Sequence, residues 1–151
     1  MLHIATAEYF ESLKCFLKHM PTQKDTELVV LKGHLLIERL LEKYLNQNLA
    51  QPSALENAGL SFNQKLSFVA ALHHDTNDEW LWGGIRKLNR LRNELAHRLE
   101  SPKLLTLVED FIVHVEENPE FPSFEAPTEI TERLQRTIFA IHETMSYRVD
   151  L

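Results

Sequence analysis

Residues 29–45 restrict the fold more than any other stretch of this 151-residue chain. They read V-V-L-K-G-H-L-L-I-E-R-L-L-E-K-Y-L, and on a helix their apolar side chains cover most of the circumference. A helix that is apolar on most sides must be surrounded by other elements. We therefore predict that residues 22–49 form a central helix around which the other elements pack.

The other segments are also expected to be helical. The chain contains only 4 glycines and 6 prolines, and its apolar residues recur at helical steps rather than in alternation. We predict an all-α, up-and-down bundle of about five long helices, forming one domain over residues 1–151. The core would span 22–118, followed by a proline-punctuated connection, 118–127, and a C-terminal helix, 128–148. That last helix could close the bundle or bind a second subunit.

Local signals predict several helix ends and contacts. Thr6 is a candidate N-cap for a first helix ending near residue 19. The residues expected to face inward from this helix are Phe10, Leu13, Phe16 and Leu17. Ser61 opens S-F-N-Q, a capping-box pattern for a helix through residue 72. Gly83 and Gly84, inside the next predicted helix, indicate a kink or a close backbone contact.

Cysteine and histidine usage argues against a metal centre. Cys15 is the single cysteine, so neither an intramolecular disulfide nor a thiolate metal site can form, and a reducing compartment fits best. His73, His74 and Asp75 are adjacent, and adjacent histidines point apart on a helix. We predict no metal or other cofactor. The sequence shows no signal-peptide pattern and no run of about 18 apolar residues, so we expect a soluble, cytoplasmic protein away from membranes.

Residues 86–100, R-K-L-N-R-L-R-N-E-L-A-H-R-L-E, carry the candidate site. The predicted core stripe of this helix is Leu88, Leu91, Leu95 and Leu99. The adjoining arc holds Asn89, Arg92, Asn93, Ala96 and His97. Arg92 and His97 flank the arc, where they could grip one group between them, and Ala96 leaves room for another helix.

Charge is distributed unevenly along the chain. The formal net charge of −6 argues against a general nucleic-acid coat. The basic residues of the helix over residues 86–100 are nevertheless Arg86, Lys87, Arg90, Arg92 and Arg98, beside one nearby acid, Glu94. A polyanion should approach here, unless the charges only solvate the helix. Glu38, on the central helix, is predicted to pair with a cation from this helix or to reach solvent at the edge.

The segment L-N-R-L-R-N-E-L-A-H, residues 88–97, resembles the signature of the HEPN superfamily, small helical bundles of which many members are RNases. That signature is an arginine, usually followed by a polar residue, and a histidine after four to six intervening residues. Arg92, Asn93 and His97 match it. The preceding segments 33–45 and 61–72 are similar to the family's earlier helices, so the resemblance covers about residues 27–117.

The resemblance implies a homodimer whose two motif helices line one cleft, and RNA cleavage without a metal by attack of the 2'-hydroxyl on the adjacent phosphate. Arg92 would hold the phosphate, His97 would transfer protons, and Asn93 would orient one of them. Glu38 and Asn89 would support these residues, while Arg86, Lys87, Arg90 and Arg98 would bind RNA. A toxin or defence effector is an expected setting.

The same resemblance leaves a second function open. Some family members bind or regulate without cutting, and the overall plan is also similar to the mannitol-operon repressor group, so a regulator of a protein, nucleotide or RNA partner is the alternative. A DNA-reading transcriptional repressor is disfavoured by the acidity and by the lack of a separate helix-turn-helix. Toxins silenced by a nucleotidyltransferase carry a tyrosine where this chain has Leu99, so another antitoxin, or none, is expected.

Overall fold

A computed structural model describes residues 7–74, 76–121 and 127–150, all of whose regular elements are helices. The α-helices are α1 (Ala7–His19), α2 (Thr26–Asn48), α3 (Phe62–Leu72), α4 (Glu79–His97), α5 (Leu104–Glu116) and α6 (Ile130–Asp150). Two short 3-10 helices are η1 (Pro52–Leu55) and η2 (Thr76–Asp78). The predicted all-α class is confirmed, with six α-helices in the described residues instead of about five. Thr6 lies outside those residues.

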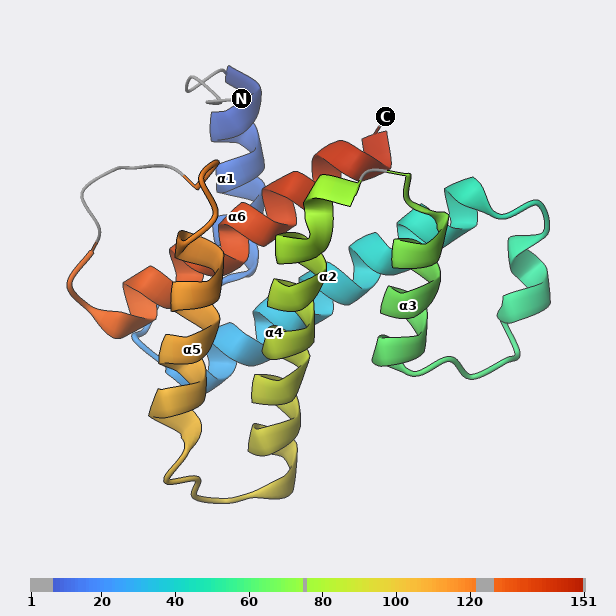
Figure 1. Ribbon diagram of the computed structural model, residues 1–151. Coiled ribbons are helices and arrows are strands. Elements are labelled where there is room, and N and C mark those ends of the chain that lie inside the picture. The colour runs from blue at the N-terminus through green and yellow to red at the C-terminus, as the bar shows by residue number, and fades with distance from the viewer. Residues whose placement is uncertain (1–6, 75, 122–126, 151) are drawn as a thin grey trace.

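The two longest helices, α2 and α6, cross the molecule side by side behind α4 and α5 (Figure 1). They run in the same direction, because Thr26 bonds to Thr131 (3.0 Å between hydroxyl oxygens) while Gly33 lies against Ile138 further along. The predicted central helix is therefore present, although it begins at Thr26, where Asp25 accepts a hydrogen bond from the Leu28 amide, and not at residue 22. Of its two possible roles, α6 closes the bundle.

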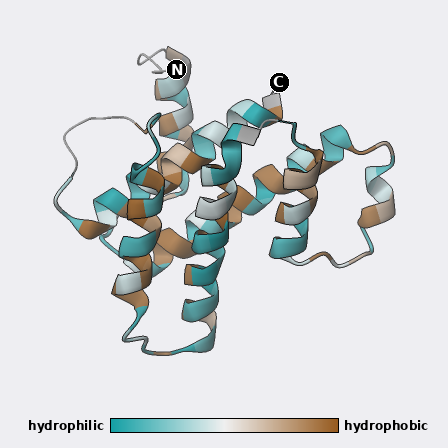
Figure 2. Cartoon of the chain, viewed as in Figure 1, coloured by the Kyte–Doolittle hydropathy of each residue, from teal (hydrophilic) through white to brown (hydrophobic). Residues whose placement is uncertain are grey.

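Helices α4 and α5 form an antiparallel pair in front of α2 and α6 (Figure 1). Gly83 and Gly84 allow this pair to pack closely, as a Cβ atom on Gly83 would lie 2.7 Å from His114 Nε2 of α5. The His114 ring also bonds to the Trp80 carbonyl (3.0 Å). The expected close contact at the two glycines is thus confirmed. Figure 2 shows hydrophobic residues recurring along the helices with hydrophilic ones between them, as expected for amphipathic packing.

Helix α3 covers the other side of α4 and begins at the predicted capping box. Ser61 Oγ accepts from the Gln64 amide, and the Gln64 side chain accepts from the Ser61 amide. Contacts between α2 and α3 advance in the same sense, from His34 against Phe62 to Tyr44 against His73. The predicted up-and-down order fails here, because the connection through η1 brings the chain back before α3 starts.

Helix α1 packs along one narrow face, which includes Leu13, Phe16 and Tyr9. Phe16 is 1% exposed and lies against Phe139 of α6, and Tyr9 contacts the same ring. Phe10 and Leu17, predicted to face inward, are about half exposed. That prediction was wrong because α1 contacts the bundle along one line, which is narrower than its apolar stripe.

A buried ion pair holds the C-terminal end of α6 to the start of α4. Arg148 donates to both carboxylate oxygens of Asp78 at 2.8 and 2.9 Å, and Asp78 is 3% exposed. His73 Nε2 lies 2.8 Å from the same carboxylate. Because both charges would be costly alone away from water, this pairing fixes the N-terminal end of α4. No helix in the described residues is long and apolar enough to span a membrane.

Candidate functional site

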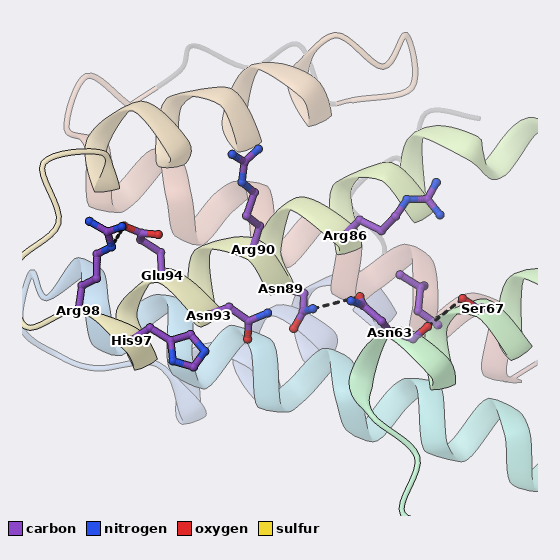
Figure 3. Close-up of a pocket in the computed structure, with 10 residues that line it drawn as sticks. Asn63, Ser67, Arg86, Asn89, Arg90, Asn93, Glu94, His97 and Arg98 are labelled. Atoms are coloured by element: carbon purple, nitrogen blue, oxygen red, sulfur yellow. Dashed lines mark hydrogen bonds and ion pairs between the residues drawn. The ribbon is translucent and has the colours of Figure 1, made fainter.

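One face of α4 borders a pocket of about 570 Å³ that α3 closes on its other side (Figure 3). The pocket residues from α3 are Asn63, Leu66 and Ser67. Those from α4 and the residue after it are Arg86, Asn89, Arg90, Asn93, Glu94, His97 and Arg98. These α4 positions recur every three or four residues, so the helix presents them together. The opposite face is buried through Leu88 and Leu91, as predicted, whereas Leu95 is partly buried.

Leu99 does not continue that core stripe. Helix α4 ends at His97, and the Leu99 side chain is fully exposed. The prediction that it belongs to the core was wrong because the helical phase is lost after the last turn.

The three motif residues divide between the pocket and its edge. Asn93 and His97 line the pocket, and His97 is exposed. Arg92 is exposed but does not line the pocket, and its Nη1 donates to Asn93 Oδ1 (3.3 Å). The structure therefore brings Asn93 and His97 together and places Arg92 behind Asn93. Within one chain, Arg92 and His97 do not converge on one pocket.

The four predicted RNA-binding residues differ in how free their charges are. Arg86 bonds to Glu79 (2.6 Å) and Arg98 lies 3.3 Å from Glu94, so these two arginines of the pocket are already paired with carboxylates. Lys87 lies outside the pocket and bonds to Asp110 of α5 (2.6 Å). Arg90 lines the pocket, is exposed and has no ion-pair partner among the described residues. Arg90 is thus the best-placed cation for an incoming anion.

A buried polar chain supports the pocket from behind. His34 Nε2 of α2 lies 2.9 Å from Asn89 Oδ1 of α4, and Asn89 Nδ2 donates to Asn63 Oδ1 of α3 (3.0 Å). The His34 ring stacks on Phe62, with 4.1 Å between centroids. Burial lowers the pKa of His34 below its ordinary value, although the bond to Asn89 and the charge of Glu38 oppose that shift. Asn89 thus links His34 of α2 to Asn63 of α3, and its predicted supporting role stays a prediction.

Sequence reasoning identified neither Asn63 nor His34 as a site residue. The only local signal for Asn63 is its place in the first turn of α3, directly after the capping serine. That position faces α4 only because of how the two helices pack.

Glu38 has a different partner from the one predicted. Its Oε1 bonds to Lys65 Nζ of α3 at 2.9 Å, and the same ammonium bonds to Glu42 at 2.7 Å. Burial alone would lower the pKa of Lys65, but the bonds to Glu42 and Glu38 raise it above its ordinary value. The prediction of a cation from the helix of residues 86–100 was wrong, because α3 lies along α2 and its lysine reaches Glu38.

No group of three or more histidine, cysteine, aspartate or glutamate side chains in the described part of the chain could hold a metal ion. Asp75 of the His73-His74-Asp75 run is outside that part. His73 Nδ1 lies 3.3 Å from the Tyr44 hydroxyl, and its Nε2 lies 2.8 Å from the Asp78 carboxylate. Comparison of the chain with protein-family models, curated proteins and solved structures finds no match. The pocket itself is therefore the basis for inferring a function.

Proposed function

We propose that the chain is a HEPN-type, metal-independent endoribonuclease that cuts RNA at the pocket between α3 and α4. The observation that carries the proposal is that one pocket is lined by an exposed histidine, His97, by amides, and by Arg90, which has no ion-pair partner in the described part of the chain. Cleavage of a phosphodiester requires a cation that binds the phosphate oxygens and a group that can transfer a proton near neutral pH. A toxin or defence effector would use such an activity.

In the proposed reaction the 2'-oxygen of RNA attacks the adjacent phosphorus, and the bond from phosphorus to the 5'-oxygen breaks. One imidazole takes the proton of the 2'-hydroxyl, and another donates a proton to the leaving 5'-oxygen. Arg92 would stabilise the charge that develops on the other phosphate oxygens, with Asn93 beside it. The products are a 2',3'-cyclic phosphate and a 5'-hydroxyl.

This chemistry calls for two copies of the chain, because a second copy supplies the second histidine and brings Arg92 to the phosphate. Support comes from the surface beside the pocket, where Arg92 and Ala96 are exposed one helical turn apart on α4 and Leu99, after the end of the helix, is exposed as well. The small Ala96 side chain permits close approach of another helix. We propose that this strip faces its counterpart in a homodimer.

The test is incubation of the purified protein with mixed RNA in EDTA, followed by analysis of product ends. Wild type should cut and leave 2',3'-cyclic phosphates, while His97→Ala should lose at least a hundredfold in rate, the contribution typical of acid–base catalysis. His74→Ala is the matched control, since His74 is exposed but lies at the end of α3, outside the pocket. Equal loss in both variants, or no cutting by wild type, would refute the nuclease.

The second candidate is a regulator that binds a partner through the same pocket without cutting. The position of Arg92 favours it, because in one chain this residue does not line the pocket with His97. Sedimentation analysis separates the two roles. The nuclease requires a dimer, and conditions that dissociate the dimer should also abolish cutting. A monomer that binds RNA without cutting would support the regulator.

A further inference from the structure

Three asparagines line the pocket, and two of them, Asn63 and Asn93, share a feature that the proposed reaction does not explain. Asn63 Oδ1 accepts a hydrogen bond from Asn89, and Asn93 Oδ1 accepts one from Arg92. Each side-chain oxygen is therefore engaged by a donor from the protein. An asparagine amide has one acceptor oxygen and one NH2 group. With the oxygen turned toward a protein donor, the NH2 group is the part of each amide that is best placed to meet a ligand.

The chain that ends at Asn63 has a direction, which is set at His34. Asn89 offers its oxygen to His34, so His34 must donate through Nε2–H, and Asn89 must then donate its NH2 to Asn63. With the proton of a neutral ring on Nδ1, His34 Nε2 would be an acceptor. Asn89 would turn over, and Asn63 would present its oxygen to the pocket instead of its NH2.

We propose that His34 is a positioning residue, which through Asn89 holds Asn63 with its amide NH2 available to the ligand, so that this wall of the pocket selects a hydrogen-bond acceptor such as a phosphodiester oxygen. This inference rests on the proposed function in taking the ligand to be RNA. His34 does not line the pocket and acts only through the two amides.

The direction of the chain does not depend on whether the His34 ring is charged. Its ring is buried against Phe62 of α3 and lies near three charged groups, Glu38 of α2, Arg92 of α4 and Lys65 of α3. Protonation would leave Nε2 a donor, since both ring nitrogens of an imidazolium carry a proton. The direction of the chain is therefore the same for the Nε2–H neutral ring and for the imidazolium, and only the Nδ1–H ring reverses it.

The first measurement is the tautomer of His34 in the wild-type protein, read from nitrogen chemical shifts and two-bond nitrogen–hydrogen couplings in an NMR spectrum at neutral pH. A ring protonated at Nε2 is expected. A ring protonated at Nδ1 would overturn the proposal without any variant being made, and irrespective of whether RNA is cut.

The second measurement is binding of a single-stranded 2'-O-methyl RNA oligonucleotide, which cannot be cut by 2'-hydroxyl attack. His34→Phe keeps a ring against Phe62 but removes the donor, and its affinity should fall about tenfold, as for a lost hydrogen bond. His34→Gln offers an amide NH2 in place of the ring donor and should recover most of that loss. His142→Phe, a histidine of α6 outside the pocket, is the matched control and should bind as wild type does.

Asn63→Asp replaces the donor by an acceptor, and Ser67→Asp puts the same charge on the same wall. Asn63→Asp is expected to lose more affinity than Ser67→Asp. Equal losses would mean that the added negative charge alone weakens binding, which would overturn the proposal. Wild-type affinity in His34→Phe would also overturn it while leaving the nuclease untouched. Binding that depends on His34 without any cleavage of ordinary RNA would instead refute the nuclease and uphold the positioning role.

Discussion

The imidazole rings of His34 and His142 are both largely shielded from water, but they differ in their hydrogen bonding. His34 bonds to Asn89, whereas Nδ1 of His142 is buried and has no hydrogen-bond partner in the described residues. The His142 ring packs 5.4 Å from the Phe16 ring of α1. Burial, followed by the charge of nearby His19, lowers the pKa of His142 to about 4. The contact of α1 with α6 therefore depends on a neutral imidazole.

Acidification should weaken the fold through His142. In the unfolded chain this histidine titrates near 6.5, and in the fold near 4, so the unfolded state takes up a proton first. The stabilisation is complete above pH 6.5 and is lost as the pH falls toward 4, by about 2 kcal/mol between pH 7.5 and 5. Urea unfolding of wild type and His142→Phe at both pH values measures it. The variant should lose less stability on acidification, and equal losses would contradict the assignment.

Sequence spacing predicted which side chains of α4 lie together better than it predicted their partners on other helices. Asn93 and His97 line the pocket as their arc on the helix suggested, because side-chain direction within a helix follows from sequence spacing alone. Lys65 as the partner of Glu38, and Asn63 as the partner of Asn89, depend on where α3 lies against α2 and α4. No periodicity within one helix contains that information.

At the scale of elements, local signals predicted helix ends where they satisfy backbone groups. The capping box at Ser61 is present because its two hydrogen bonds are formed by residues three apart. The apolar stripe of α1 led to the wrong prediction that Phe10 and Leu17 are buried. A stripe shows which face of a helix can be buried, and not how much of that face a neighbouring helix covers. The direction of α3 relative to α2 was likewise set by the connection through η1, whose path has no periodic signal.

The crossing of α2 and α6 depends on Gly33. A Cβ atom at this position would lie 2.8 Å from both Cδ1 and Cγ2 of Ile138, and the branched Cγ2 cannot move away independently of the helix. Gly33→Ala should therefore destabilise the protein by about 1–3 kcal/mol, even though alanine favours a helix by about 1 kcal/mol over glycine.

Urea unfolding tests this expectation, with Lys32→Ala as the neighbouring exposed control on the same helix. The control should change stability by less than about 0.5 kcal/mol. A more stable Gly33→Ala variant would mean that α2 and α6 separate at little cost, and that the close contact does not hold them in place.

For the whole molecule, the net charge of the chain and the charge of the pocket lining have opposite signs. The chain carries −6 overall, yet the pocket is lined by three arginines and one carboxylate. The Glu94 carboxylate is itself occupied by Ser101 (2.6 Å) and Arg98. RNA binding should thus involve few phosphate contacts and a shallow dependence on salt, unlike binding by a broadly basic protein.

Arg90 should account for a distinct part of that dependence. Arg90→Ala is expected to weaken binding of single-stranded RNA and to reduce the slope of log K against log salt by about 0.7, the value for one phosphate contact. Lys87→Ala, whose charge is already held by Asp110 outside the pocket, should leave the slope nearly unchanged. Fluorescence anisotropy between 50 and 300 mM salt, roughly the range in which such contacts are resolved, measures both; identical slopes for the two variants would exclude Arg90 as a phosphate contact.

Helix α4 carries core residues on one face and pocket residues on the opposite face. Both sets therefore depend on the same helical register. Inserting or deleting a single residue between Leu88 and Asn93 would rotate everything beyond it by about 100°, turning His97 away from the pocket and polar side chains into the core. Length changes can be absorbed only outside the helix, for instance in the turn after Arg98. Substitution, and not insertion or deletion, is therefore the route by which this site can diversify.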